Sequence, residues 1–74
     1  MAEPLFQMTK EFAAALAIGV PALGAGYAIA LVGAAAAGAV AEKPEVSGKV
    51  LLFVALAEAI AIYGLVVALM ILFQ

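Results

Sequence analysis

The chain has 74 residues, of which 70% are hydrophobic and only 11% are charged, with a mean hydropathy of +1.34 and a net charge of −2. A soluble domain this short needs a polar exterior that such a composition cannot supply, so the sequence predicts one small membrane protein. The absence of cysteine and histidine excludes disulfides, thiolate or imidazole metal sites and histidine acid–base chemistry, and the net negative charge gives no basis for binding nucleic acid.

The first apolar segment covers residues 12–41, which carry no charge. Between residues 13 and 41, 19 of 29 residues are Ala or Gly, with small residues every four positions from Ala22 to Gly38. Small residues at helical spacing let backbones approach closely in lipid, so this helix is expected to associate through them. Pro21 is expected to kink the helix. The glycines expected to mediate packing are Gly19, Gly24, Gly26, Gly33 and Gly38.

Residues 42–49 hold four of the chain's eight charges and separate the two apolar segments. Such a short polar link forces neighbouring helices to run antiparallel. The predicted fold is therefore an all-α membrane protein, a two-helix transmembrane hairpin with helix 1 at about 5–42, a polar loop at 43–48 and helix 2 at 49–73. Lys43 and Lys49 flank the loop and only Lys10 lies at the other end, which favours a cell-membrane protein with two spans and a cytoplasmic loop.

The second apolar segment, residues 50–73, contains a single charged residue, Glu58. Its 24 residues make a helix of about 36 Å, enough to cross a hydrocarbon core of about 30 Å. An ionisable group at that depth is costly and indicates a functional site. Because a low dielectric favours the neutral acid, Glu58 is expected to be protonated except where water or a cation reaches it, as in a proton carrier. The alternative is a carboxyl group that only hydrogen-bonds between packed helices.

The side chains around Glu58 favour H⁺ as the transported ion. The nearest polar side chain within the apolar segment is Tyr63, and neither apolar segment contains Ser, Thr, Asn or Gln. A sodium ion requires several oxygen ligands arranged as a cage, so a sodium-carrying version of the site is the less favoured alternative. No metal site and no cofactor are expected.

The two helices also differ in thickness, since the second is rich in Leu, Ile and Phe. A thin helix beside a thick one forms a wedge, and repeated wedges close into a homo-oligomeric ring with the thin helices inside. A plain dimer of hairpins is the simpler alternative.

The residues resemble the proteolipid subunit, called c or K, of rotary ATP synthases. Residues 58–69 closely resemble the second helix of the F-type subunit c, and residues 22–28 and 32–42 resemble the first helix of archaeal A-type and vacuolar-type proteolipids. The resemblance implies a closed rotor ring in the membrane that couples a proton gradient to rotation through reversible protonation of Glu58. It further implies a stator subunit whose arginine faces Glu58, and central-stalk subunits at the polar loop. It implies a non-catalytic subunit, in keeping with the absence of a phosphate-binding loop.

The same resemblance assigns supporting roles to further residues. The proton site would be lined by Tyr63, Ile62, Ala25 and Ile29, and the stalk would contact Glu42, Lys43, Pro44 and Glu45. F-type loops usually read Arg-Gln-Pro where this chain has Glu42-Lys43-Pro44, so the archaeal A-type is favoured over the F-type.

Two other classes of function remain open from the residues. A pore-forming hairpin would expose Glu58 to a water-filled lumen, but no polar residue accompanies Glu58 on its helix face. A structural hairpin that assists assembly would have no need of a carboxylate at this depth.

Overall fold

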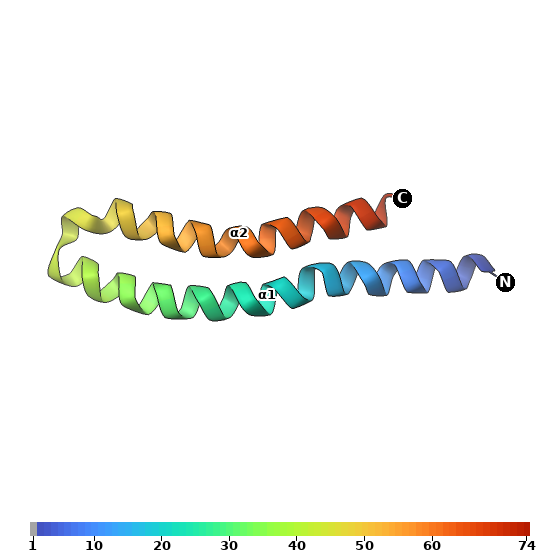
Figure 1. The fold of residues 1–74 in the computed structure, drawn as a ribbon, viewed down its shortest axis with the longest axis horizontal. Coiled ribbons are helices and arrows are strands. Elements are labelled where there is room, and N and C mark those ends of the chain that lie inside the picture. The colour runs from blue at the N-terminus through green and yellow to red at the C-terminus, as the bar shows by residue number, and fades with distance from the viewer. Residues whose placement is uncertain (1) are drawn as a thin grey trace.

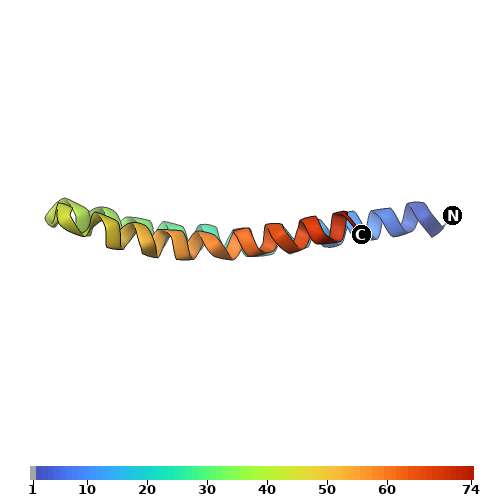
Figure 2. The same ribbon diagram turned by 90° about the horizontal axis from the view of Figure 1, so that it is seen from above.

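The computed structural model describes the backbone of residues 2–74 and the side chains from Glu3 onward, as one helical hairpin (Figure 1). Helix α1 spans Ala2–Glu42, a 3₁₀ turn η1 spans Pro44–Val46, and helix α2 spans Ser47–Leu72. The hairpin is a rod of 62 × 17 × 9 Å, with both chain ends on the side opposite the turn. Seen from above, the two helices overlap along one gently bowed line (Figure 2).

Helix α1 begins at Ala2, earlier than the expected start near residue 5. Pro4 lies in the first turn, where its missing N–H group would have had no partner within the helix. Glu3 also lies in the first turn, where a negative charge complements the helix dipole. The Thr9 hydroxyl donates to the Leu5 carbonyl at 2.9 Å inside the same stretch. These local features favour helix up to the described end of the chain.

The connection between the helices is tighter than the predicted loop at 43–48. The Lys43 N–H donates to the Ala39 carbonyl at 2.8 Å, and the Val46 N–H donates to the Lys43 carbonyl at 3.0 Å. The Ser47 N–H then donates to the Pro44 carbonyl, so the 3₁₀ turn runs directly into α2. Lys43 has an extended backbone, with φ −136° and ψ 89°, but the 3₁₀ turn that follows it leads directly into helix, so α2 begins at Ser47 and not at residue 49.

Small side chains form the seam between the helices. In the described part of the chain, the buried residues are Gly64 and four alanines that are each at most 8% exposed: Ala14, Ala25, Ala57 and Ala68. On α2 the buried and half-buried positions alternate at spacings of four and three, which is the pattern of helices that pack at a shallow angle. These positions are Val50, Val54, Ala57, Ala61, Gly64, Ala68 and Ile71, and Ala59 is half-buried outside this pattern.

The glycines of α1 do not pack against α2. A Cβ atom built on any of the five glycines expected to mediate packing would meet nothing within 4 Å. The close glycine contact within the hairpin is instead at Gly64 of α2, a residue that the sequence analysis did not single out. Helix α1 continues through Pro21 without interruption. The expected packing role of the α1 glycines therefore has no counterpart inside a single hairpin.

Both helices are long and apolar enough to cross a membrane. The two candidate spans are Glu3–Glu42 and Pro44–Leu72, and only 6% of the most apolar part of each is buried within the hairpin. A core helix of a soluble protein would be mostly buried, so this exposure fits helices that face lipid or further protein chains. The rod of 62 Å exceeds a bilayer thickness of about 40–45 Å, headgroups included, so it is long enough for its two ends to reach the aqueous phases on either side.

Candidate functional site

Glu58 lies within the apolar part of α2, nearer to the turn than to the chain ends. At 1.5 Å per residue, it is about 12 Å along the helix from Val50 and about 22 Å from Phe73. Its side chain is exposed, whereas the preceding Ala57 is buried in the seam. Glu58 therefore flanks the helix–helix contact and points out of the hairpin.

The Glu58 carboxylate has no partner among residues 3–74. The side-chain hydrogen bonds of this part of the chain join Thr9 to Leu5 and Lys10 to the Gln74 carbonyl, both near the end opposite the turn. The nearest lysine along α2 is Lys49, about 13 Å away along the helix axis. An ionised carboxylate in hydrocarbon needs a cation or hydrogen-bond donors. Any such partner must come from outside the hairpin.

The two predicted site residues on α2, Ile62 and Tyr63, lie on different faces of the helix relative to Glu58. Ile62 follows Glu58 by one turn on the same face and is 52% exposed, so it stands beside the carboxylate. Tyr63 is five residues on, which places it about 140° around the helix from Glu58. It is 73% exposed and makes no hydrogen bond to Glu58. Within one hairpin, the Tyr63 hydroxyl therefore does not contact the Glu58 carboxyl group, because the two side chains point in different directions from α2.

The two predicted site residues on α1 lie in or near the seam. Pro21 packs against Gly64. The helices are antiparallel, and Tyr27 follows Pro21 by six residues while Glu58 precedes Gly64 by six, so Glu58 lies at the same height as Tyr27. Ala25 is only 2% exposed because it faces α2, and Ile29 is half-buried. Their side chains support the seam at the height of Glu58 and do not line the exposed carboxylate.

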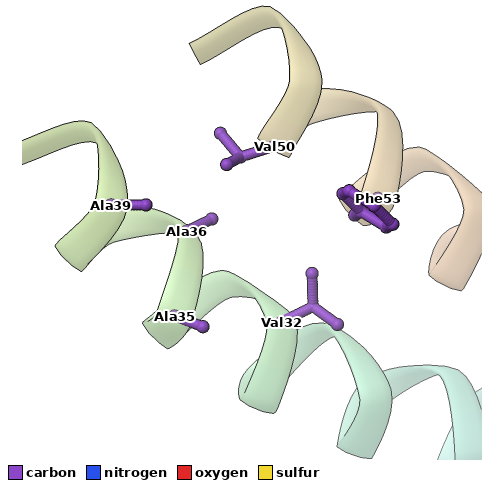
Figure 3. A pocket seen from close by; sticks show the side chains of 6 residues that line it. All are labelled: Val32, Ala35, Ala36, Ala39, Val50 and Phe53. Atoms are coloured by element: carbon purple, nitrogen blue, oxygen red, sulfur yellow. The ribbon is translucent and has the colours of Figure 1, made fainter. Parts of the chain in front are cut away.

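An apolar groove of about 270 Å³ opens between the helices on the turn side of Glu58 (Figure 3). The side chains of Val32 and Val50 point into it from opposite helices. Water in a cavity requires two to four polar partners, and the side chains that line this groove supply none. The groove is therefore not a water path to Glu58, which counts against a pore within one hairpin. It is lined by Val32, Ala35, Ala36, Ala39, Val50 and Phe53.

The polar residues at the turn are available for contact, since Glu42, Lys43, Pro44 and Glu45 are all exposed. Across the described residues, no group of three or more His, Cys, Asp or Glu side chains could hold a metal ion.

Two membrane-length helices, an alanine seam and one outward-facing carboxylate within the apolar span define a membrane hairpin suited to carrying an ion while packed among other chains. The family model of the ATP synthase C subunit matches residues 12–71. The chain therefore belongs to the family of ATP synthase c subunits.

Individual relatives agree with this assignment. The chain is 43% identical over 75 residues to the ATP synthase c subunit of Nostoc sp., covering 96% of this chain and 93% of the relative. It is 43% identical over 74 residues to the ATP synthase c subunit of Thermosynechococcus vestitus, covering 95% of this chain and 90% of the relative. It is 40% identical over 73 residues to the A-type ATP synthase subunit K of Methanocaldococcus jannaschii, covering 99% of this chain but 32% of that protein. The predicted preference for the A-type over the F-type is not confirmed, because both types match at similar identity.

Proposed function

We propose that this chain is the proton-carrying subunit of the rotor ring of a membrane ATP synthase, and that Glu58 binds and releases one proton in each passage. The observation that carries the proposal is the position of Glu58, exposed beside the seam and without a partner in its own hairpin. A carboxyl group in this position is free to meet a group on another subunit. The subunit transmits force and does not catalyse ATP chemistry.

The surface of α1 supports assembly into a ring. One side of α1, next to the seam, carries only small residues at spacings of three and four, and nearly all are exposed in the single hairpin. In lipid, such a stripe is buried most effectively by a neighbouring helix that approaches closely. Because α2 does not cover this stripe, neighbouring copies of the chain can pack against it. It consists of Ala15, Gly19, Ala22, Gly26, Ala30, Gly33 and Ala37.

The family resemblance implies two partners outside the ring, and the charges that the hairpin leaves exposed are suited to both. A stator subunit would present an arginine to the ionised Glu58, because a guanidinium neutralises a carboxylate in a low-dielectric medium. Central-stalk subunits would contact the exposed residues from Glu42 to Glu45. In a ring, Tyr63 projects toward surrounding chains, so its hydroxyl would serve a neighbouring copy more readily than Glu58 of its own.

The carried ion in this proposal is H⁺, since one carboxylate amid apolar side chains falls short of a sodium cage. Moving each charge across 100 mV supplies about 2.3 kcal/mol, and the ring adds successive steps into torque. The loop lies on the cytoplasmic side in this proposal, in line with Lys43 and Lys49. The A-type preference rests on the Glu42-Lys43-Pro44 sequence of the loop and on the likeness of residues 22–28 and 32–42 to the first helix of archaeal proteolipids.

The decisive experiment is Glu58→Gln in the complete ATP synthase, reconstituted in vesicles. Glutamine keeps the size of the side chain but cannot release a proton, so the ring should assemble and proton-driven ATP synthesis should be lost. Glu3→Gln is the matched control, because Glu3 is exposed near the chain end and should be silent. ATP synthesis at the normal rate in Glu58→Gln would refute the proposal.

A further inference from the structure

The closest approach between the two helices involves Gly64. A Cβ atom on this residue would lie 2.5 Å from the Ala17 carbonyl oxygen and 2.9 and 3.1 Å from Cγ and Cβ of Pro21. Contacts below 3.0 Å to a backbone atom require the helices to move apart. No other glycine in the described part of the chain would meet any atom within 4 Å. Gly64 is therefore the position at which α2 tolerates no side chain.

Pro21 explains why the Ala17 carbonyl is directed at α2. In an α-helix the N–H of residue 21 would donate to the carbonyl of residue 17, and proline has no N–H. Carbonyls freed in this way tilt out of the helix and must find another partner, above all inside a membrane. In Gly64 a hydrogen atom takes the place of Cβ and faces the same oxygen, as in a weak Cα–H···O hydrogen bond. Pro21 and Gly64 thus form one complementary contact.

This contact is close to the carboxylate. Glu58 precedes Gly64 by six residues on the same helix, a rise of about 9 Å. A helix is stiff over this length, so the point where α2 is held against α1 fixes both the height and the rotation of the Glu58 side chain. The other buried positions of the seam carry only alanine methyl groups, which allow small sliding and rotation.

We propose that Gly64 and Pro21 are positioning residues for Glu58. The Ala17 carbonyl has no N–H partner at Pro21 and contacts Gly64 instead. This contact holds α2 in the rotation at which the Glu58 carboxyl group projects beside the seam toward another subunit. This inference rests on the proposed role of Glu58 as the proton carrier, and it assigns a cause to the direction in which that side chain points.

A double-mutant cycle in the complete ATP synthase tests the proposal. Gly64→Ala should slow proton-driven ATP synthesis by about tenfold or more, because the added methyl group overpacks the seam. In Pro21→Ala the N–H of residue 21 returns, the Ala17 carbonyl turns back into its own helix, and the Cγ atom beside Gly64 disappears while Cβ remains. The double variant Pro21→Ala/Gly64→Ala should therefore recover at least about fivefold over Gly64→Ala alone. A double variant no better than Gly64→Ala overturns the proposal.

A second measurement separates positioning from assembly. A hydrophobic carbodiimide should label Glu58, and the pH of half-maximal labelling in assembled rings would then report the surroundings of that carboxyl group. Gly64→Ala should shift this pH, and the double variant should return it toward the original value. Gly48→Ala is the matched control, because it makes the same change on α2 where a Cβ atom meets nothing within 4 Å. A purely structural role would lower the yield of rings and leave the pH unchanged, and that result also overturns the proposal.

The outcomes distinguish this inference from the proposed function. If Glu58→Gln abolishes synthesis while Gly64→Ala changes neither the rate nor the labelling, only the positioning role is refuted. If Glu58→Gln retains synthesis, the carrier role fails whatever the Gly64 variants do.

Discussion

Ala57 and Glu58 are adjacent in α2 but face different surroundings, since Ala57 is 8% exposed in the seam and Glu58 is exposed beside it. The step of about 100° between neighbouring helical residues produces this separation. The buried methyl group holds the helix against α1, and the carboxyl group next to it remains accessible to another subunit. Stability of the hairpin and access to Glu58 are therefore served by different faces of one helical turn.

Carbodiimide labelling should be confined to Glu58 among the five acidic residues. The reagent attacks neutral carboxylic acids in apolar surroundings, and the other four acidic residues lie near the ends of the rod or at the turn. Because the neutral acid is the reactive form, labelling should rise as the pH falls. Mass spectrometry of the labelled chain identifies the site. Millimolar sodium should slow the reaction little, and strong protection by sodium would overturn the assignment of H⁺ as the carried ion.

Much of the fold followed from the sequence because the medium leaves few choices. The uncharged residues 12–41 and the segment 50–73 can satisfy their backbone groups in lipid only as helices, and the short polar link makes them antiparallel. The depth of Glu58 within the second helix followed from its place in the apolar segment 50–73, of which it is the ninth residue. The turn was predicted as longer than it is, because its hydrogen bonds depend on the 3₁₀ geometry at Pro44 and not on polarity.

The packing was harder to predict because α1 contains small residues on several faces. Its glycines suggested close contacts, yet the seam uses Ala14 and Ala25, and the glycines remain open. A signal for the seam did exist on α2, where small residues recur at spacings of four and three, at Ala57, Ala61, Gly64 and Ala68. The orientation of Tyr63 could also have been anticipated, since a separation of five residues does not place two side chains on one helix face.

Ala14→Leu should destabilise the hairpin. Ala14 is 4% exposed against α2, and a larger side chain there would push the helices apart at a cost of about 1–3 kcal/mol. The measurement is thermal unfolding in detergent micelles, followed by circular dichroism. Ala41→Leu makes the same substitution at an exposed position of the same helix and should leave the unfolding temperature nearly unchanged. Equal behaviour of the two variants would contradict the seam described above.

The side of the membrane that holds the turn can be determined with a single cysteine, because the chain has none of its own. Ser47 is exposed at the start of α2, so Ser47→Cys should react readily with a maleimide. A membrane-impermeant maleimide should label it in inside-out vesicles and not in right-side-out vesicles, as the lysines at the turn predict. Thr9→Cys, at the other end of the rod, should show the opposite pattern. Labelling of Ser47→Cys from the outside of intact cells would place the loop on the wrong side.

Gly26→Val should separate folding of the hairpin from assembly of the ring. A Cβ atom at Gly26 meets nothing within 4 Å in the single hairpin, so the added side chain should leave the contact between α1 and α2 intact. Close approach of α1 to a neighbouring copy would be blocked, because such packing in lipid depends on small residues. Native mass spectrometry should detect closed oligomers of the unaltered chain and smaller species of Gly26→Val, with the helix content unchanged. Gly48→Val, at the turn, should still assemble. Rings of normal size in Gly26→Val would show that copies meet through another face of the hairpin, and the exposed bulky residues of α2 would then be the surface to test.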